Sequence, residues 1–411
     1  MALSRKPRQS KSQQCVDKGD TRRNIFESFR ETYGNGCFET ESTMKQIRLA
    51  LKSYITGNNC YGIVLSFIVE DAIQFHQNYL SAKNKTLDIM REYNEQSDTF
   101  CECDSNHCCA HEVLIIAANI CDKYNFKDAV LVKKLMLAIY KCDCGFDRFF
   151  NFLDPLIFPF EIDSALYRMN HNAIGEISQT HLNTLEYFLN VGRDIYINVE
   201  YTEFDMSRRD TGPMLLSRTL SLPFIDAPVP SCRGSSPLLL ACHAVSSKAV
   251  RLLLRWGADP LRPGQNNHIV GLHFQHPLHV ITSKMNAALF WKRHHEHLDP
   301  FVREEFMRRQ KRQEEELMQC LLLFSRVLTQ LPVKINNHIS NIRESSSGPM
   351  FNLHSEYKQL LSILGQSGAP ELKHICRIAI RKVLARRRLL PNGIYQLPLP
   401  KLVMSYLDLE F

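Results

Sequence analysis

The chain has 411 residues, of which 44% are hydrophobic and 23% are charged, and its formal net charge is +7. These values are ordinary for a globular protein, and the length allows a sizeable core spread over two or three domains. The modest positive charge permits contact with acidic partners but does not by itself indicate nucleic-acid binding.

Fourteen cysteines would suit a secreted disulfide protein, but the first residues predict a different compartment. Residues 1–23 are polar and basic and contain no apolar segment typical of a signal peptide. Apolar runs such as 113–120 are much shorter than the roughly 18 residues of a membrane span. We therefore expect a soluble protein of the cytoplasm or the nucleus, without a membrane partner, whose thiols are reduced.

The N-terminal part divides into a tail and a helical region. Residues 1–22 are rich in Lys, Arg, Ser and Gln, and we expect a disordered basic tail there. Residues 23–160 carry apolar residues at helical spacing, so we predict several helices. Asp128 is placed to cap the helix that follows it.

The middle of the chain contains the segment GSSPLLLACHAVSSKAVRLLLRWGADP at 234–260. Pro237 suits the first turn of a helix, Ala241 allows close helix pairing, and Gly257 suits a left-handed helix cap. The leucines 252–254 provide the buried face of a second helix. This pattern resembles an ankyrin repeat, with Ser236 in place of the usual Thr and Leu239 in place of the usual His, substitutions that predict weaker hydrogen bonding at the turn.

Two weaker units flank this repeat. HPLHVITSK at 276–284 resembles a second repeat start, and HLNTLEYFLNVGRDI at 181–195 resembles the second helix of an upstream repeat. We predict degenerate ankyrin repeats over 164–298, interrupted by a long loop at 201–233. In that loop, Ser221 has the spacing of a kinase site, although an ordinary loop serine is the more common interpretation.

Residues 299–331 begin with Asp299 and Pro300, which favour a helix start, and we predict a connecting helix. Residues 332–366 are predicted to be a linker. The last segment, 367–411, contains the most specific pattern of the chain.

In this last segment, Leu372, Cys376 and Ile380 are spaced i, i+4, i+8 and form one apolar stripe on a predicted helix, broadened by Ala379 and Val383. The basic residues of RKVLARRR at 381–388 are predicted to form a solvated face. After a Pro-Asn-Gly turn, Leu397, Pro398, Leu399 and Pro400 predict an extended, pre-ordered strip that shows its two leucines. A short closing helix follows, and we expect this small unit to need a partner.

These two motifs, 21 residues apart between Cys376 and Leu397, resemble the SOCS box, and with the ankyrin pattern the chain is similar to the ankyrin-repeat and SOCS-box family. The resemblance implies that Leu372, Cys376 and Ile380 bind elongin C, and that the Leu-Pro-Leu-Pro strip selects cullin-5. Glu371 departs from the Ser, Thr or Pro that the family prefers.

The resemblance implies an all-α fold, with a helical N-terminal region, a short ankyrin stack and a SOCS box of three short helices. It further implies a non-catalytic, cofactor-free adaptor of a ubiquitin ligase. The implied partners are elongins B and C, cullin-5 with its RING protein, and a target that the sequence does not identify. The alternative is an ankyrin scaffold without ligase activity.

Two other hypotheses remain. A cysteine-rich segment could hold a structural zinc ion through four weak candidate ligands, although the spacing is irregular. These candidates are Cys101, Cys103, Cys108 and Cys109. Nucleic-acid binding through residues 381–388 is the second hypothesis, and we expect no nucleic-acid partner because a solvated helix face explains the charges.

Overall fold

The computed structural model describes residues 61–91, 109–143, 145–150, 177–205, 214–230, 234–262, 276–278, 280–282, 284–285, 300–328 and 371–410. The predicted tail 1–22, the predicted linker 332–366 and the zinc candidates Cys101, Cys103 and Cys108 lie outside these residues. Cys109 begins a helix, but its side chain is not described. The chain divides into two compact units, Met1–Cys144 and Gly145–Phe411.

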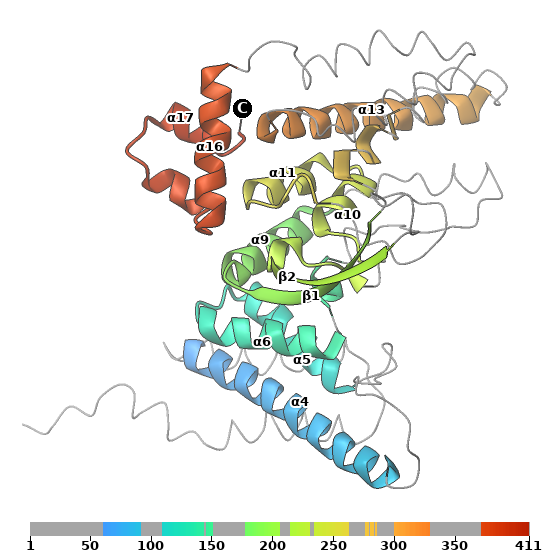
Figure 1. The fold of residues 1–411 in the computed structure, drawn as a ribbon, viewed down its shortest axis with the longest axis vertical. Coiled ribbons are helices and arrows are strands. Elements are labelled where there is room, and N and C mark those ends of the chain that lie inside the picture. The colour runs from blue at the N-terminus through green and yellow to red at the C-terminus, as the bar shows by residue number, and fades with distance from the viewer. Residues whose placement is uncertain are drawn as a thin grey trace, which may run out of the picture. The chain divides into compact units, whose positions relative to one another are not determined.

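The described residues of the first unit form three helices that pack against one another, α4 (Tyr61–Arg91), α5 (Cys109–Lys123) and α6 (Ala129–Asp143) (Figure 1). Their apolar faces meet in a core that includes Leu65, Leu114 and Leu135, each fully buried. Asp128 caps α6 as predicted, because its Oδ1 accepts a hydrogen bond from the Leu131 N–H at 3.0 Å.

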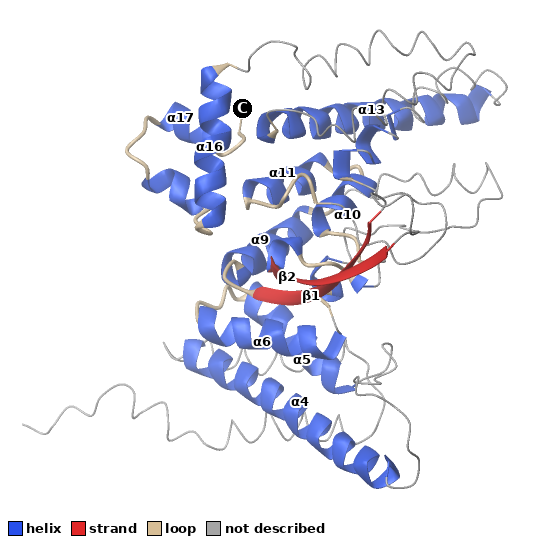
Figure 2. Cartoon of the chain, in the orientation of Figure 1, coloured by secondary structure: helices blue, strands red, loops and turns tan. Residues whose placement is uncertain are grey.

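The second unit is also mainly helical, and Figure 2 shows one two-stranded sheet among its helices. Its first elements are α7 (Asp147–Phe150), α9 (Gln179–Gly192), β1 (Tyr196–Asp205), β2 (Met214–Pro223) and η2 (Phe224–Asp226). Further described elements are α10 (Pro237–His243), α11 (Ser247–Arg255), α13 (Pro300–Val327), α16 (Leu372–Arg386), η6 (Asn392–Gln396) and α17 (Lys401–Leu407). The predicted helical class of the fold is confirmed. None of the helices in the described ranges is long and apolar enough to cross a membrane.

Helices α10 and α11 form the helix pair that the ankyrin pattern predicts. Pro237 is at the first position of α10, and Ala241 is fully buried where the two helices pack. The Ser236 hydroxyl still accepts a hydrogen bond from the Leu239 N–H at 3.3 Å, so replacing Thr with Ser keeps the cap. Gly257 has a φ of +93°, the left-handed conformation expected after the second helix.

The hairpin β1–β2 replaces part of the loop that the sequence predicted at 201–233. The two strands pair antiparallel from Tyr196↔Pro223 to Asp205↔Met214. Ile197 and its partner Leu222 are buried, while Asn198 and its partner Ser221 are exposed, so the alternation of a half-buried strand is present. Prolines and serines in this segment obscured that alternation, and Ser221 lies in a strand rather than in a loop.

Helix α11 lies between α9 and α13, and it contacts both of them. Helices α9, α11 and α13 therefore stack in this order, and their C-terminal ends lie beside the C-terminal segment (Figure 1). This stack provides the surface on which the C-terminal segment docks.

We expect Gly257→Ala to lower the free energy of unfolding of the second unit by roughly 1–3 kcal/mol. The new Cβ would lie 3.3 Å from Leu390 Cδ1 and 3.4 Å from Ala385 Cβ, in a backbone conformation that alanine rarely adopts. Urea denaturation measures the change.

Gly62→Ala is the matched control, since it adds the same methyl group to helix α4 with no other atom within 4 Å. We expect it to leave stability unchanged or slightly higher. Equal losses in the two variants would contradict the role assigned to Gly257.

Candidate functional site

Helix α16 exposes a row of apolar side chains to solvent. We define the exposed apolar stripe as Leu372, Ile375, Cys376, Ala379 and Val383. At 100° per residue these five positions share one side of the helix. Leu372 is 75% exposed and Val383 is 51% exposed, which is unusual for apolar residues on an amphipathic helix. An exposed apolar row of this kind marks an interaction surface.

The opposite side of α16 is buried, and it carries basic residues. Arg377 and Arg381 are each only 5% exposed. The prediction of a solvated basic face is therefore wrong at Arg381, because the neighbouring helix ends provide carbonyl acceptors that the sequence of α16 cannot reveal. Lys382, Arg386 and Arg387 are exposed, as that prediction required.

The Arg381 guanidinium joins the ends of two helices. Its Nη1 donates to the Leu407 carbonyl of α17 at 2.7 Å, and its Nη2 donates to the Leu254 carbonyl of α11 at 2.5 Å. A cation is favourable at these positions because the C-terminal carbonyls of a helix carry partial negative charge. Burial lowers the pKa of Arg381 to about 10, so the side chain stays charged at neutral pH.

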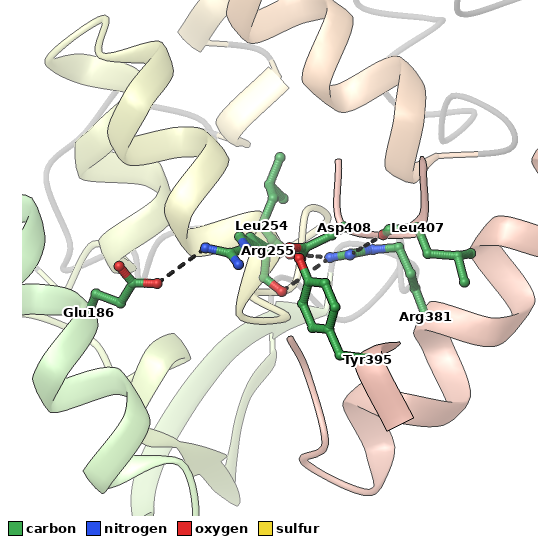
Figure 3. Close-up of polar contacts among 7 residues, drawn as sticks. All are labelled: Glu186, Leu254, Arg255, Arg381, Tyr395, Leu407 and Asp408. Atoms are coloured by element: carbon green, nitrogen blue, oxygen red, sulfur yellow. Dashed lines mark hydrogen bonds and ion pairs between the residues drawn. The ribbon is translucent and has the colours of Figure 1, made fainter. Parts of the chain in front are cut away.

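A buried carboxylate with two hydrogen-bond donors lies beside this arginine (Figure 3). Asp408 is fully buried, and its Oδ2 accepts hydrogen bonds from Arg255 Nε at 2.8 Å and from the Tyr395 hydroxyl at 2.5 Å. Arg255 also pairs with Glu186 of α9 at 3.2 Å. Burial would lower the pKa of Arg255, but Asp408 and Glu186 outweigh it and raise that pKa.

Two further contacts extend the basic side of α16 along the stack. His374 Nε2 donates to the Leu328 carbonyl, next to the end of α13, at 3.0 Å, and its Nδ1 accepts from Arg377 Nη2 at 2.9 Å. Because a carbonyl only accepts and a guanidinium only donates, the His374 proton is on Nε2. Arg388 donates to the Asp194 carbonyl, just beyond α9, at 3.3 Å. Basic side chains of the C-terminal segment thus reach the ends of α13, α11 and α9.

The Leu-Pro-Leu-Pro strip is extended at its two ends, with ψ angles of 142° at Leu397 and 146° at Pro400. It bends between them, because the Leu399 N–H donates to the Leu397 carbonyl at 2.8 Å, so the prediction of an extended strip holds only in part. Its leucines do not face solvent, however. Leu397 and Leu399 are half-buried against a small core, and Pro398 and Pro400 are the exposed residues. The side chains of this core are Leu384, Leu390, Ile394 and Leu407. The prediction that the strip shows its leucines is wrong, because without them this core would be open on one side.

The structure separates the three residues predicted to bind elongin. Leu372 and Cys376 are exposed on the stripe, while Ile380 is half-buried against the small core. Ile375 is 41% exposed and also belongs to the stripe. The predicted i, i+4, i+8 pattern did not include it, because it lies at i+3 from Leu372. Asp408, Arg255 and Tyr395 were also missed, since no local pattern pairs residues so far apart in sequence.

Comparison with protein families explains the arrangement at this end of the chain. Residues 368–408 match the family model of the SOCS box. We call this segment the SOCS box after that match. It covers α16, η6, the Leu-Pro-Leu-Pro strip and α17, so the exposed apolar stripe lies within it.

Curated relatives confirm the similarity to ankyrin-repeat and SOCS-box proteins. Ankyrin repeat and SOCS box protein 17 of Canis lupus familiaris is 24% identical over 254 residues, covering 61% of this chain and 75% of that protein. The Bos taurus protein is 25% identical over 245 residues, covering 57% and 70%. The Homo sapiens protein is 32% identical over 96 residues, covering 23% and 30%. No solved structure matches the chain.

The SOCS box is a general adaptor module of ubiquitin ligases, which dock on it through elongins and a cullin. A SOCS-box adaptor role is therefore supported for this chain in general terms. Neither the residues that contact each partner nor the particular cullin follows from the similarity.

We expect Arg381→Met to lower the free energy of unfolding by on the order of 3 kcal/mol, because the buried carbonyls of Leu254 and Leu407 each lose a charged donor. The methionine retains an unbranched apolar stem. Urea denaturation of the full chain measures the loss.

Lys382→Met is the matched control, because Lys382 is the next residue on α16 and is exposed. We expect its effect to stay within about 0.5 kcal/mol. A similar small effect for Arg381→Met would show that its hydrogen bonds contribute little.

Proposed function

We propose that the chain is a substrate-recognition adaptor of an elongin BC–cullin-5–RING ubiquitin ligase. One observation carries this proposal: the SOCS-box helix α16 turns its apolar residues outward, with Leu372 75% exposed at its start. An exposed row of apolar side chains on a docked helix needs a partner that buries it.

Elongin C is the proposed partner of the exposed apolar stripe. Leu372 would fill an apolar pocket, and Cys376 would pack beside it, since both face the same open side of α16. Ile380 would contribute through its exposed edge, because its other side packs on the SOCS-box core. The polar contacts of α16 lie on its opposite side, so binding at the stripe would leave the ankyrin contacts intact.

Cullin-5 is the proposed partner of the Leu-Pro-Leu-Pro strip. Pro398 and Pro400 are exposed and restrict the backbone torsions, while Leu397 and Leu399 anchor the strip to the small core. This division of roles gives a rigid ridge that loses little conformational entropy on binding.

The proposed mechanism is proximity rather than catalysis by this chain. The ankyrin and N-terminal regions would hold a target protein while the SOCS box holds the ligase. Joining both in one chain raises the effective concentration of target lysines near the charged ubiquitin enzyme. We also propose that this takes place in the cytoplasm or the nucleus.

We expect Leu372→Ala with Cys376→Ala to weaken elongin B–elongin C binding by roughly 10- to 100-fold, since a leucine loses its burial at the interface. Because both side chains are exposed, the unbound chain keeps its fold. Co-purification and calorimetric titration measure the loss.

Leu402→Ala is the matched control, because Leu402 is 71% exposed on α17 and does not belong to the stripe. It should bind the elongins like the unmodified chain. Failure of the unmodified, folded chain to bind them at all would favour the alternative of an ankyrin scaffold without ligase activity.

That alternative draws on one structural feature. Glu371 occupies the N-cap of α16 and forms no side-chain capping bond, and it pairs instead with Lys373 at 2.9 Å. A charged side chain next to Leu372 disfavours the entry of Leu372 into an apolar pocket. If the unmodified chain does not bind the elongins and Glu371→Ser does, Glu371 is the cause of the missing binding.

We expect Pro398→Ala with Pro400→Ala to weaken cullin-5 binding by about 10-fold, because the strip loses its pre-ordered backbone. Elongin binding should be unchanged. Titration of cullin-5 into the preformed elongin complex measures the effect, with Pro260→Ala in the ankyrin turn as a control for loss of a proline.

A parallel titration with cullin-2 tests the choice of cullin. Equal or tighter binding of cullin-2 would contradict the assignment of cullin-5 while leaving the adaptor role in place.

A further inference from the structure

The carboxylate of Asp408 lies where the SOCS box meets the last turn of the ankyrin helix α11. Its side chain is fully buried, and its Oδ2 accepts from Arg255 of α11 and from Tyr395 of the SOCS box itself (Figure 3). The contact with Arg255 joins residues 153 positions apart in the sequence. Asp408 is thus a direct charged link between the two parts of the unit.

Arg381 ties the same two parts together from α16. Its guanidinium donates to Leu254 of α11 and to Leu407, the residue before Asp408. A shift of α17 relative to α11 would therefore break the Arg255–Asp408 pair and the Arg381 bonds together. Separating a buried carboxylate from its cation leaves an uncompensated charge, which strongly opposes such a shift.

An exposed ion pair between the C-terminal segment and the stack restricts this movement less. The ion pair between Arg388 and Asp194 spans 3.8 Å, and its side chains are 35% and 46% exposed. Ion pairs at that exposure are weak because water and salt screen them. The buried pair at 2.8 Å is the stronger restraint.

We propose that Asp408 is a positioning residue that holds the SOCS box in one orientation on helix α11. This inference rests on the proposed adaptor function for its purpose, because a fixed orientation keeps a bound target at one distance from the ligase. A loose junction would spread the target over a larger volume and lower its effective concentration at the transfer site.

Double electron–electron resonance measures the orientation directly. Spin labels are attached to p-acetylphenylalanine placed at Arg251 on α11 and at Lys401 on α17, both exposed, so the fourteen cysteines stay unchanged. The full chain should give one narrow distance distribution, both alone and with elongins B and C. Asp408→Asn should widen it at least about twofold, because the charge pair is lost while the shape of the side chain is kept.

Arg255→Gln should widen the distribution to the same extent, and the double variant should add little, because both changes remove one interaction. Glu186→Gln is the matched control: it removes the other carboxylate from Arg255, but Glu186 belongs to α9 of the stack. It should leave the distribution narrow. Circular dichroism and thermal unfolding verify that each variant is folded under the labelling conditions.

An unchanged distribution in folded Asp408→Asn and Arg255→Gln would overturn the proposal, as would equal widening in Glu186→Gln. Elongin affinity, measured separately, should stay within about threefold in every variant, because the stripe is on the other side of α16. Loss of elongin binding by the unmodified chain would count against the adaptor function alone, since the distance measurement in the free chain needs no ligase component.

Discussion

The arrangement of the C-terminal segment depends on the hydrogen bonds that the Arg381 guanidinium makes at the ends of two helices. The last carbonyl groups of a helix have no partners within that helix, and those of α11 and α17 point toward this one side chain. The guanidinium supplies several donors in a fixed plane, so a single arginine serves both ends. Once Arg381 faces inward, the direction of every other residue on α16 follows from the helical period.

The outward direction of the apolar stripe is a consequence of that choice. With basic residues turned toward the stack, Leu372 and Val383 on the opposite side must face solvent. The small core of the SOCS box cannot use them, since it is filled by leucines and isoleucines from α16, η6, the extended strip and α17. The core of this segment is too small to fold alone, and the exposed stripe leaves the other side of α16 uncovered. Both features suit a module that joins a repeat stack to a further protein.

Features with a local cause could be predicted from the sequence. A helix pair needs a helix start, a small residue where the helices pack and a left-handed cap. These positions are filled by Pro237, Ala241 and Gly257, where the ankyrin pattern places them. The SOCS-box motifs were equally visible as short spacings. The hairpin β1–β2 had a local alternation too, but the prolines and serines around it favoured the interpretation as a loop.

Features that depend on distant partners could not be predicted. Arg377 and Arg381 have the spacing of any solvated basic face. Arg381 is buried against carbonyls of other helices, and Arg377 lies over the ring of Tyr406 on α17. Ile380 shares the i, i+4, i+8 spacing of the stripe, yet it lies about 80° round the helix from Leu372, which is far enough to meet the SOCS-box core. Helical spacing shows which residues share one side of a helix. It does not show whether that side faces solvent or another part of the protein.

The fifteen residues of α16 therefore have different roles on the two sides of the helix. The inner side requires particular donors at particular carbonyls, so it tolerates few substitutions without loss of the fold. The outer side requires only apolar shape that a partner can bury, so its residues can change without disturbing the unbound chain. Because the basic side chains that bind the stack all project from one side, binding on the other leaves the stack's contacts in place. Under the proposed function, the helix would therefore need no conformational change of its own to keep a target near a docked ligase.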